Sequence, residues 1–221
     1  MKGRATKLPW KLRYVWGERL ASRMRLLMVK ATHRHCTVRF LGPVRIGPGF
    51  RLDIPDEGTL IVGPYVDFRS GFRCDINGTG RVEIGSGTFF TSNVLIQCST
   101  SIVIGERCAF GQSTLIVDGY HRYRDPNVHW MDQGYDYRPI RIGDGAGISD
   151  KCTIQADVGE RAMIASGSVV NRPIPAFCLA VGAPARVVSY FGPRERRDEI
   201  IPPRPSRGTA DRFRPAQAAN D

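Results

Sequence analysis

The sequence has no apolar run long enough for a membrane-spanning helix, which needs about 18 or more consecutive apolar residues. Arg and Lys also interrupt every candidate apolar stretch near the N-terminus, so this segment does not resemble a secretory signal. The 221 residues are 42% hydrophobic and 24% charged, which suffices for one sizeable core. We therefore expect a cytoplasmic protein with a single main domain.

Closely spaced metal ligands are missing as well. The cysteines include no CxxC motif, and none of the four histidines pairs with a further ligand at a spacing typical of a metal site. We expect no metal and no disulfide framework, but reduced thiols, several of them packed as small hydrophobic residues. The six cysteines are Cys36, Cys74, Cys98, Cys108, Cys152 and Cys178.

Acidic residues are scarce at the front of the chain. Residues 1–35 hold ten Lys and Arg against one acid, Glu18, whereas residues 36–192 hold 15 basic and 15 acidic residues. The net charge of +11 therefore belongs mainly to the N-terminal segment and not to the body of the protein. A nucleic-acid-binding fold would carry its basic face on the body and would show a base-reading motif, so no nucleic-acid partner is expected.

The middle of the chain carries a six-residue repeat. Neither a helix, with a period of 3.6, nor a simple strand, with a period of 2, produces a sustained spacing of six. A β-sandwich gives turns every 8–12 residues without this fixed phase. The repeating apolar residues are Ile46, Leu52, Val62, Phe68, Cys74, Ile84, Phe90, Ile96, Ile104, Phe110, Ile116, Ile142, Ile148, Ile154, Val158, Ile164 and Val170.

Glycine follows the residue that opens each group of hexads, as in Ile84-Gly85 and Ile142-Gly143. Three hexads make one triangular coil, in which the apolar residue points inward and a small residue occupies the corner. The repeat therefore predicts an all-β protein, a parallel β-helix of about seven coils that rises roughly 35 Å at about 4.8 Å per coil. The spacing does not determine the hand of the helix.

The last coils carry the motifs that identify a family. They run Ile142-Gly-Asp-Gly-Ala-Gly-Ile148, then Val158-Gly-Glu-Arg-Ala-Met-Ile164, and close with Gly182-Ala-Pro-Ala-Arg186. Over roughly residues 44–188 the chain resembles the hexapeptide-repeat acyltransferases, and most of all the galactoside, maltose and xenobiotic O-acetyltransferases. The resemblance implies a left-handed parallel β-helix and a homotrimer with its active sites at the subunit interfaces.

One histidine stands where the repeat is interrupted. After Ile116 the chain reaches His121, and the hexads resume only near Ile142. The resemblance implies that His121 is the catalytic general base and that the polar and aromatic loop after it reaches a neighbouring subunit. A neutral imidazole can take the proton from an attacking hydroxyl. Asp118 or Asp125 could orient that imidazole, although a corner Asp more often satisfies only turn backbone.

The resemblance also implies acyl-CoA as the co-substrate, bound in the cleft between two prisms. The positions that match the family's pantetheine contacts are Asp150 and Ser166. Arg172, after the last full coil, and Arg186, in the closing motif, match residues that face the nucleotide phosphates. Guanidinium groups suit phosphate recognition.

The acceptor is expected to be a carbohydrate hydroxyl, in a pocket that differs from the galactoside enzymes. Thr91 and Ser99 stand where the sugar-acetylating members have Asn and Asp, with Asn93 nearby, and Trp130 is a candidate in the loop. Gly147 replaces a bulky aromatic residue of the family. The missing bulk leaves room for an acyl chain longer than acetyl.

The two ends differ from the repeat. We divide the chain into a basic helical cap over residues 1–40, a β-helix domain over 41–188 with an excursion loop over 119–139, and an extended Pro- and Arg-rich tail over 189–221. Apolar residues at helical spacing predict a helix over 8–28. These residues are Leu8, Leu12, Trp16, Leu20, Met24 and Leu27.

Two interpretations of this helix remain open. It packs over the open first coil with its basic face in solvent, as solenoid ends require a cap, or it lies on an anionic membrane as a peripheral contact through residues 1–35. The capping interpretation is favoured. The first hypothesis for the whole chain is a CoA-dependent O-acyltransferase with acetyl as the default group. The alternatives are a medium-chain transferase, for example of octanoyl to a glycolipid precursor, and a non-catalytic membrane-associated β-helix scaffold.

Overall fold

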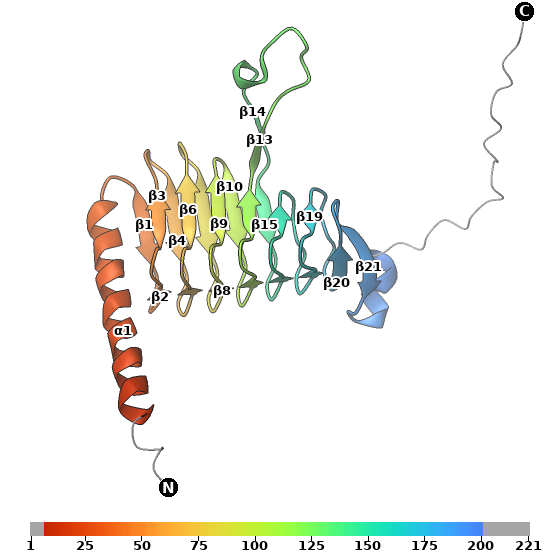
Figure 1. Ribbon diagram of the computed structural model, residues 1–221. Helices are drawn as coiled ribbons and strands as arrows, with labels where there is room; N and C mark the ends of the chain where they lie inside the picture. The colour runs from red at the N-terminus through yellow and green to blue at the C-terminus, as the bar shows by residue number, and fades with distance from the viewer. Residues whose placement is uncertain (1–6, 201–221) are drawn as a thin grey trace, which may run out of the picture.

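A computed structural model describes residues 7–200 of the chain, with side chains from residue 17 to residue 199. Three parallel sheets form the faces of a triangular prism, and one helix lies across its N-terminal end (Figure 1). This arrangement is typical of a left-handed parallel β-helix, as the resemblance implies.

Most coils contribute one short strand to each face, the last coils add only isolated bridges at Val158 and Ile174 to the first sheet, and a hairpin leaves the prism in the middle. The first sheet contains β1 (Thr37–Phe40), β4 (Thr59–Val62), β7 (Arg81–Ile84), β10 (Ser101–Ile104) and β15 (Ile140–Ile142). The second contains β2 (Arg45–Ile46), β5 (Asp67–Phe68), β8 (Phe89–Phe90), β11 (Ala109–Phe110), β16 (Gly147–Ile148), β18 (Met163–Ile164), β20 (Cys178–Val181) and β21 (Arg186–Tyr190). The third contains β3 (Arg51–Asp53), β6 (Arg73–Ile76), β9 (Leu95–Cys98), β12 (Leu115–Val117), β17 (Thr153–Ile154) and β19 (Val169–Val170).

All seventeen apolar residues of the predicted repeat are buried inside the prism. Equivalent residues of successive coils pair directly in register, so the inward side chains stack on one another. The rings of Phe68 and Phe90 lie 5.3 Å apart at 7°, and those of Phe90 and Phe110 lie 4.8 Å apart at 10°. The spacing of six is therefore confirmed as the period of the core.

The corner glycines are required because successive coils approach closely at that edge. A Cβ atom on Gly85 would lie 2.5 Å from the carbonyl carbon of Gly105, one coil further on. A side chain at Gly63 would meet the backbone nitrogen of Ser86 at 2.8 Å in the same way. This explains why glycine follows the opening residue of each group.

Helix α1 (Lys7–Thr32) caps the first coil. The Ser22 Oγ accepts a hydrogen bond from the Ile46 backbone N at 2.8 Å, the Arg25 Nη1 donates to the Ile46 carbonyl at 3.0 Å, and Val29 is buried. The favoured capping interpretation is confirmed for the described part of the helix. The helix was expected to turn its basic face to solvent. This orientation was wrong, because Leu20, Met24 and Leu27 face solvent while Arg25 turns inward. The side chains of Leu8, Leu12 and Trp16 lie outside the described residues.

The C-terminal end is closed by β21, which runs antiparallel to β20. The chain then forms a short 3-10 helix, η2 (Arg194–Arg196), followed by α2 (Arg197–Ile200). The expectation of an extended segment is wrong for these residues, because they form helical turns and Arg196 packs over the ring of Phe177, 5.7 Å from its centroid. The rest of the predicted tail lies outside the described residues.

The cysteines are unpaired, as expected, and all but Cys36 are buried. Burial, followed by the nearby Asp118 carboxylate, raises the pKa of the Cys98 thiol to about 12. These thiols therefore pack as core atoms. Neither helix of the described part is long and apolar enough to cross a membrane.

Candidate active site

The predicted interruption of the repeat is a hairpin arm that rises from the prism (Figure 1). Strand β13 (Gly119–His121) pairs antiparallel with β14 (Tyr135–Tyr137), and the 3-10 helix η1 (Trp130–Asp132) lies near the tip. The Gln133 side chain closes the tip, because its amide donates to the carbonyls of Asp125 and Val128 at 2.9 and 2.7 Å. The arm is thus held in one shape by its own hydrogen bonds.

His121 sits at the base of this arm between two aromatic rings. The Tyr135 ring lies 4.1 Å from the imidazole, centroid to centroid, and the Trp130 ring packs edge-on at 4.8 Å. The Nδ1 atom is buried and has no hydrogen-bond partner among the described residues. The imidazole is therefore positioned by packing alone, with one ring nitrogen unsatisfied.

Neither nearby carboxylate orients His121. The Asp118 carboxylate is buried and accepts hydrogen bonds from the Ser99 N at 2.9 Å, the Thr100 N at 2.7 Å and the Thr100 Oγ1 at 2.8 Å. Asp125 accepts from the Asn127 backbone N within its own turn. The expectation that these residues satisfy turn backbone is confirmed.

Asp118 is expected to be essential for stability rather than for proton transfer. The Asp118→Ala variant leaves the two backbone N–H groups without an acceptor in a buried site, so its free energy of unfolding should fall by roughly 3 kcal/mol. Denaturant unfolding checks this value. The Asp125→Ala variant is the matched control, since Asp125 is exposed and its loss should change stability by no more than about 0.5 kcal/mol. Equal losses in the two variants would contradict this role.

A polar groove of about 550 Å³ opens beside His121, along the third sheet. Ser99, a predicted acceptor residue, lies in it, and so do amides from two lower coils and tyrosines from the arm. The hexad pattern gives no means of finding the tyrosines, because they lie outside the repeat. The groove is lined by Asn77, Gln97, Ser99, Val117, Asp118, Gly119, Tyr120, His121, Tyr135 and Tyr137.

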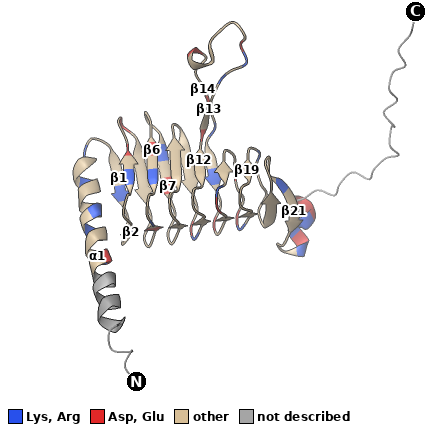
Figure 2. Ribbon diagram, viewed as in Figure 1, with Lys and Arg blue, Asp and Glu red and all other residues tan. Residues whose placement is uncertain are grey.

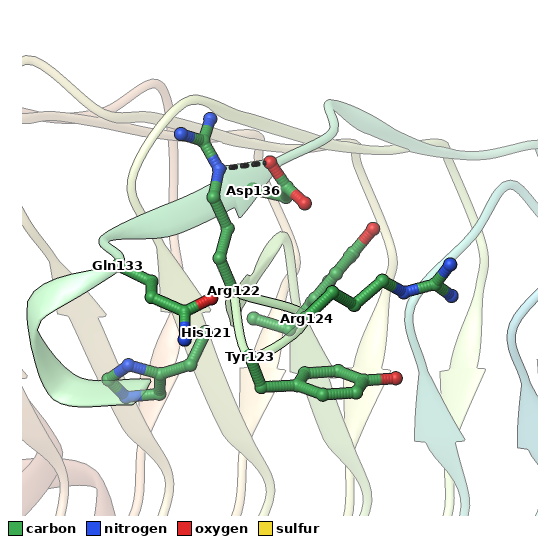
Figure 3. Close-up of a pocket in the computed structure, with 7 residues that line it drawn as sticks. His121, Arg122, Tyr123, Arg124, Gln133 and Asp136 are labelled. Atoms are coloured by element: carbon green, nitrogen blue, oxygen red, sulfur yellow. Dashed lines mark hydrogen bonds and ion pairs between the residues drawn. The ribbon is translucent and has the colours of Figure 1, made fainter. Parts of the chain in front are cut away.

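The other side of the arm forms a second hollow of about 380 Å³ (Figure 3). Arg122 is paired there with Asp136 at 2.6 Å, so its charge is compensated. Tyr123 and Arg124 extend away from the side on which His121 and Gln133 lie. His121 therefore borders both hollows, and the polar groove is the better acceptor candidate because it holds hydrogen-bonding groups of the sheet.

Thr91 lies elsewhere, in a shallow apolar hollow of about 260 Å³ on the second sheet. It shares this hollow with Gly147, Met163 and Phe89, and its Oγ1 is buried without a hydrogen-bond partner among the described residues. Asn93 occupies a left-handed corner with φ of 60°. The three predicted acceptor residues of the coils therefore do not meet within one copy of the chain.

The predicted donor residues lie on the last coils. The Asp150 Oδ1 accepts a hydrogen bond from the Gln112 backbone N at 2.7 Å, which ties two coils together. Ser166, Arg172 and Arg186 are exposed, and the Arg186 Nη1 donates to the Ala185 carbonyl at 3.0 Å. These residues are accessible to a ligand along the outside of the prism. Within the described residues, no three His, Cys, Asp or Glu side chains gather as metal ligands.

No protein-family model matches the chain. The known proteins that it resembles in sequence include several acetyltransferases. A probable acetyltransferase of Mycobacterium tuberculosis is 29% identical over 184 residues, which cover 81% of this chain and 57% of the relative. The serine acetyltransferase of Bacillus subtilis is 31% identical, covering 53% and 52% of the two chains. The galactoside O-acetyltransferase of Escherichia coli is 26% identical, covering 52% and 57%. The chain thus spans about half the length of these relatives.

A solved structure shows the same fold. A mutant of the N-acyltransferase AntD from Bacillus cereus, in complex with dTDP and coenzyme A, has a TM-score of 0.61 at 14% identity and covers 78% of this chain and 92% of its own. The hexad core, the corner glycines and the named relatives agree with the motifs of the last coils. In sequence the chain is similar to acetyltransferases, and in its repeat and fold it is similar to the hexapeptide-repeat acetyltransferases.

Proposed function

We propose that the protein transfers an acyl group from acyl-CoA to a hydroxyl of a sugar, glycoside or polysaccharide precursor, with His121 as the general base. The observation that carries the proposal is the buried, unsatisfied imidazole nitrogen at the edge of a polar groove. Relatives named as acetyltransferases support the reaction class. Acetyl is the default acyl group.

In the proposed mechanism, the acceptor hydroxyl attacks the thioester carbonyl carbon while His121 takes the hydroxyl proton. Backbone N–H groups stabilise the oxyanion of the tetrahedral intermediate. The carbon–sulfur bond then breaks, and the imidazolium returns its proton to the leaving thiolate, which gives the ester and free coenzyme A. No acyl-enzyme forms, so a single base performs both proton transfers.

The donor is proposed to lie along the last coils of a homotrimer. Asp150 and Ser166 face the pantetheine arm, and the exposed guanidinium groups of Arg172 and Arg186 hold the phosphates. The assembly would also explain why Thr91 and Ser99 lie on different faces, because neighbouring copies can bring those faces together. In this arrangement the arm, with Trp130, covers the site of the next copy.

The groove favours a carbohydrate acceptor. Asn77 and Gln97 provide amides that both donate and accept hydrogen bonds, and Tyr120, Tyr135 and Tyr137 provide flat apolar faces. Sugars present both hydroxyl groups and apolar ring faces. The galactoside relative acts on a sugar and the serine acetyltransferase on serine, so both are included as acceptors in the test.

The test is an assay of thiol release from a panel of acyl-CoA donors with a mixed sugar library and with serine. The proposal expects release that depends on a sugar. Release that depends only on serine would overturn the choice of acceptor. A lack of release with every donor and acceptor, from protein with an intact fold, would favour the non-catalytic scaffold.

A medium-chain donor is the second candidate, favoured by the apolar hollow at Gly147. A Cβ atom on Gly147 would lie 2.5 Å from the Met163 Sδ, so the Met163 side chain occupies the space that a bulky residue would need. We expect the Met163→Ala variant to raise the ratio of octanoyl to acetyl transfer by about tenfold, since it opens this hollow. The Gly147→Trp variant should lower the ratio. Initial rates with the two donors give the ratio, and no change in either variant would contradict a role in chain length.

A further inference from the structure

Helix α1 presents an apolar stripe to solvent on the side opposite its cap contacts. Leu20, Met24, Leu27 and Met28 are 64%, 55%, 61% and 64% exposed, although they recur at the spacing that places them on one helix face. The helix contacts the prism through Ser22, Arg25 and Val29, which lie on the other face. Capping therefore leaves this apolar stripe of the described part of the helix exposed to solvent.

Basic side chains border this stripe. Arg23 and Lys30 are exposed and, at 100° per residue, fall beside Leu27 along one edge of the stripe, and Arg34 follows the end of the helix. The one acid of this region, Glu18, lies 3.9 Å from Arg25. Figure 2 shows that the charged positions along the described part of α1 are mainly basic. Charge along the outward side of the described helix is therefore almost entirely positive.

We propose that this outward face of α1 binds the surface of an anionic lipid bilayer. An apolar stripe with a basic border is the pattern of a helix that lies in the membrane interface, where apolar side chains enter the boundary and basic ones meet anionic headgroups. A second copy of the chain fits less well, because a two-fold contact would bring the same basic edges together. The cap and the membrane contact use different faces, so the two interpretations of this helix are compatible.

The position of α1 on the prism determines where a bound bilayer would lie relative to His121. The helix lies across one end of the prism (Figure 1), so the bilayer would lie at that end. His121 follows β12, the fourth strand of the third sheet. It therefore lies three coil spacings, or about 14 Å, from the first coil along the prism. A lipid-linked acceptor would then present its polar group at the height of the polar groove.

The test measures co-sedimentation of the full chain with vesicles of phosphatidylcholine alone or mixed with phosphatidylserine. We expect association with the anionic vesicles that the double variant Met24→Glu/Leu27→Glu lowers at least about tenfold. The double variant Arg23→Glu/Lys30→Glu should lower it by more than about tenfold and remove its salt dependence. Val188→Glu is the matched control, because Val188 is 57% exposed at the opposite end of the prism, and it should bind like the parent.

Equal binding by the stripe variant and the parent would overturn the proposal, as would equal affinity for neutral and anionic vesicles. Gel filtration of the same variants tests whether a second copy of the chain, and not a membrane, covers the apolar stripe. If the stripe variant breaks an oligomer and the parent does not bind vesicles, the face belongs to a second copy. None of these measurements depends on catalysis, so their failure is distinct from failure of the proposed function.

Discussion

The His121→Ala variant is expected to lose a factor of about 10² to 10⁴ in the rate of acyl transfer. The loss follows from the chemistry, because a neutral hydroxyl attacks a thioester slowly until a base removes its proton. The His121 side chain packs against two aromatic rings, and no hydrogen bond of this side chain is seen among the described residues, so its truncation should leave the fold intact. Thiol release with saturating acyl-CoA and acceptor measures the effect, and the melting temperature should remain close to that of the parent.

His129→Ala is the matched control for this prediction. His129 lies on the same arm, where its Nδ1 accepts a hydrogen bond from the Met131 backbone N at 3.3 Å at the start of η1. The residue is exposed and lines neither hollow beside His121. We expect kcat within about threefold of the parent, since this change removes a weak local contact. An active His121→Ala enzyme, or equal losses in both variants, would exclude His121 as the base.

The Gly85→Val variant is expected to lose about 3 kcal/mol of unfolding free energy or more, which corresponds to roughly 10 °C in melting temperature. The new Cβ atom would meet the Gly105 carbonyl carbon at 2.5 Å and the Glu106 N at 2.6 Å. These atoms cannot move aside, because the Gly85 N donates to the Ile104 carbonyl at 2.8 Å and the coils are held in register there. Thermal and denaturant unfolding measure the loss.

Gly17→Ala is the control for the corner glycine. Among the described residues, and apart from the backbone of its own helix, nothing lies within 4 Å of a Cβ atom at Gly17, which is exposed on α1. The change should stabilise the protein by up to about 1 kcal/mol, because alanine is the better helix former. A similar loss in both variants would show that the corner does not need glycine.

The core was predictable from the sequence because one physical rule produces it. Each coil must place an apolar side chain inward three times, so residues such as Phe68, Phe90 and Phe110 recur at a fixed phase and stack in space. The place where the phase stops also located the arm and His121. The role of Asp118 followed from turn chemistry, since a short carboxylate at a corner reaches backbone N–H groups.

The features that escaped prediction depend on tertiary contacts. Helical spacing groups Leu20, Met24 and Leu27 on one face of α1 but does not tell which face meets the prism, and polar contacts from Ser22 and Arg25 decide it. The tyrosines beside His121 come from an irregular arm without a period. Gly147 indicated empty space, but Met163 from the next coil covers part of it.

The most direct measurement of the central claim is an experimental structure of the assembled protein with coenzyme A bound. We expect the thiol sulfur within about 4 Å of the His121 imidazole of one copy, beside the polar groove. We also expect the phosphates of coenzyme A next to Arg172 and Arg186. Coenzyme A bound away from every His121, or an assembly in which no His121 borders a shared cleft, would contradict this claim.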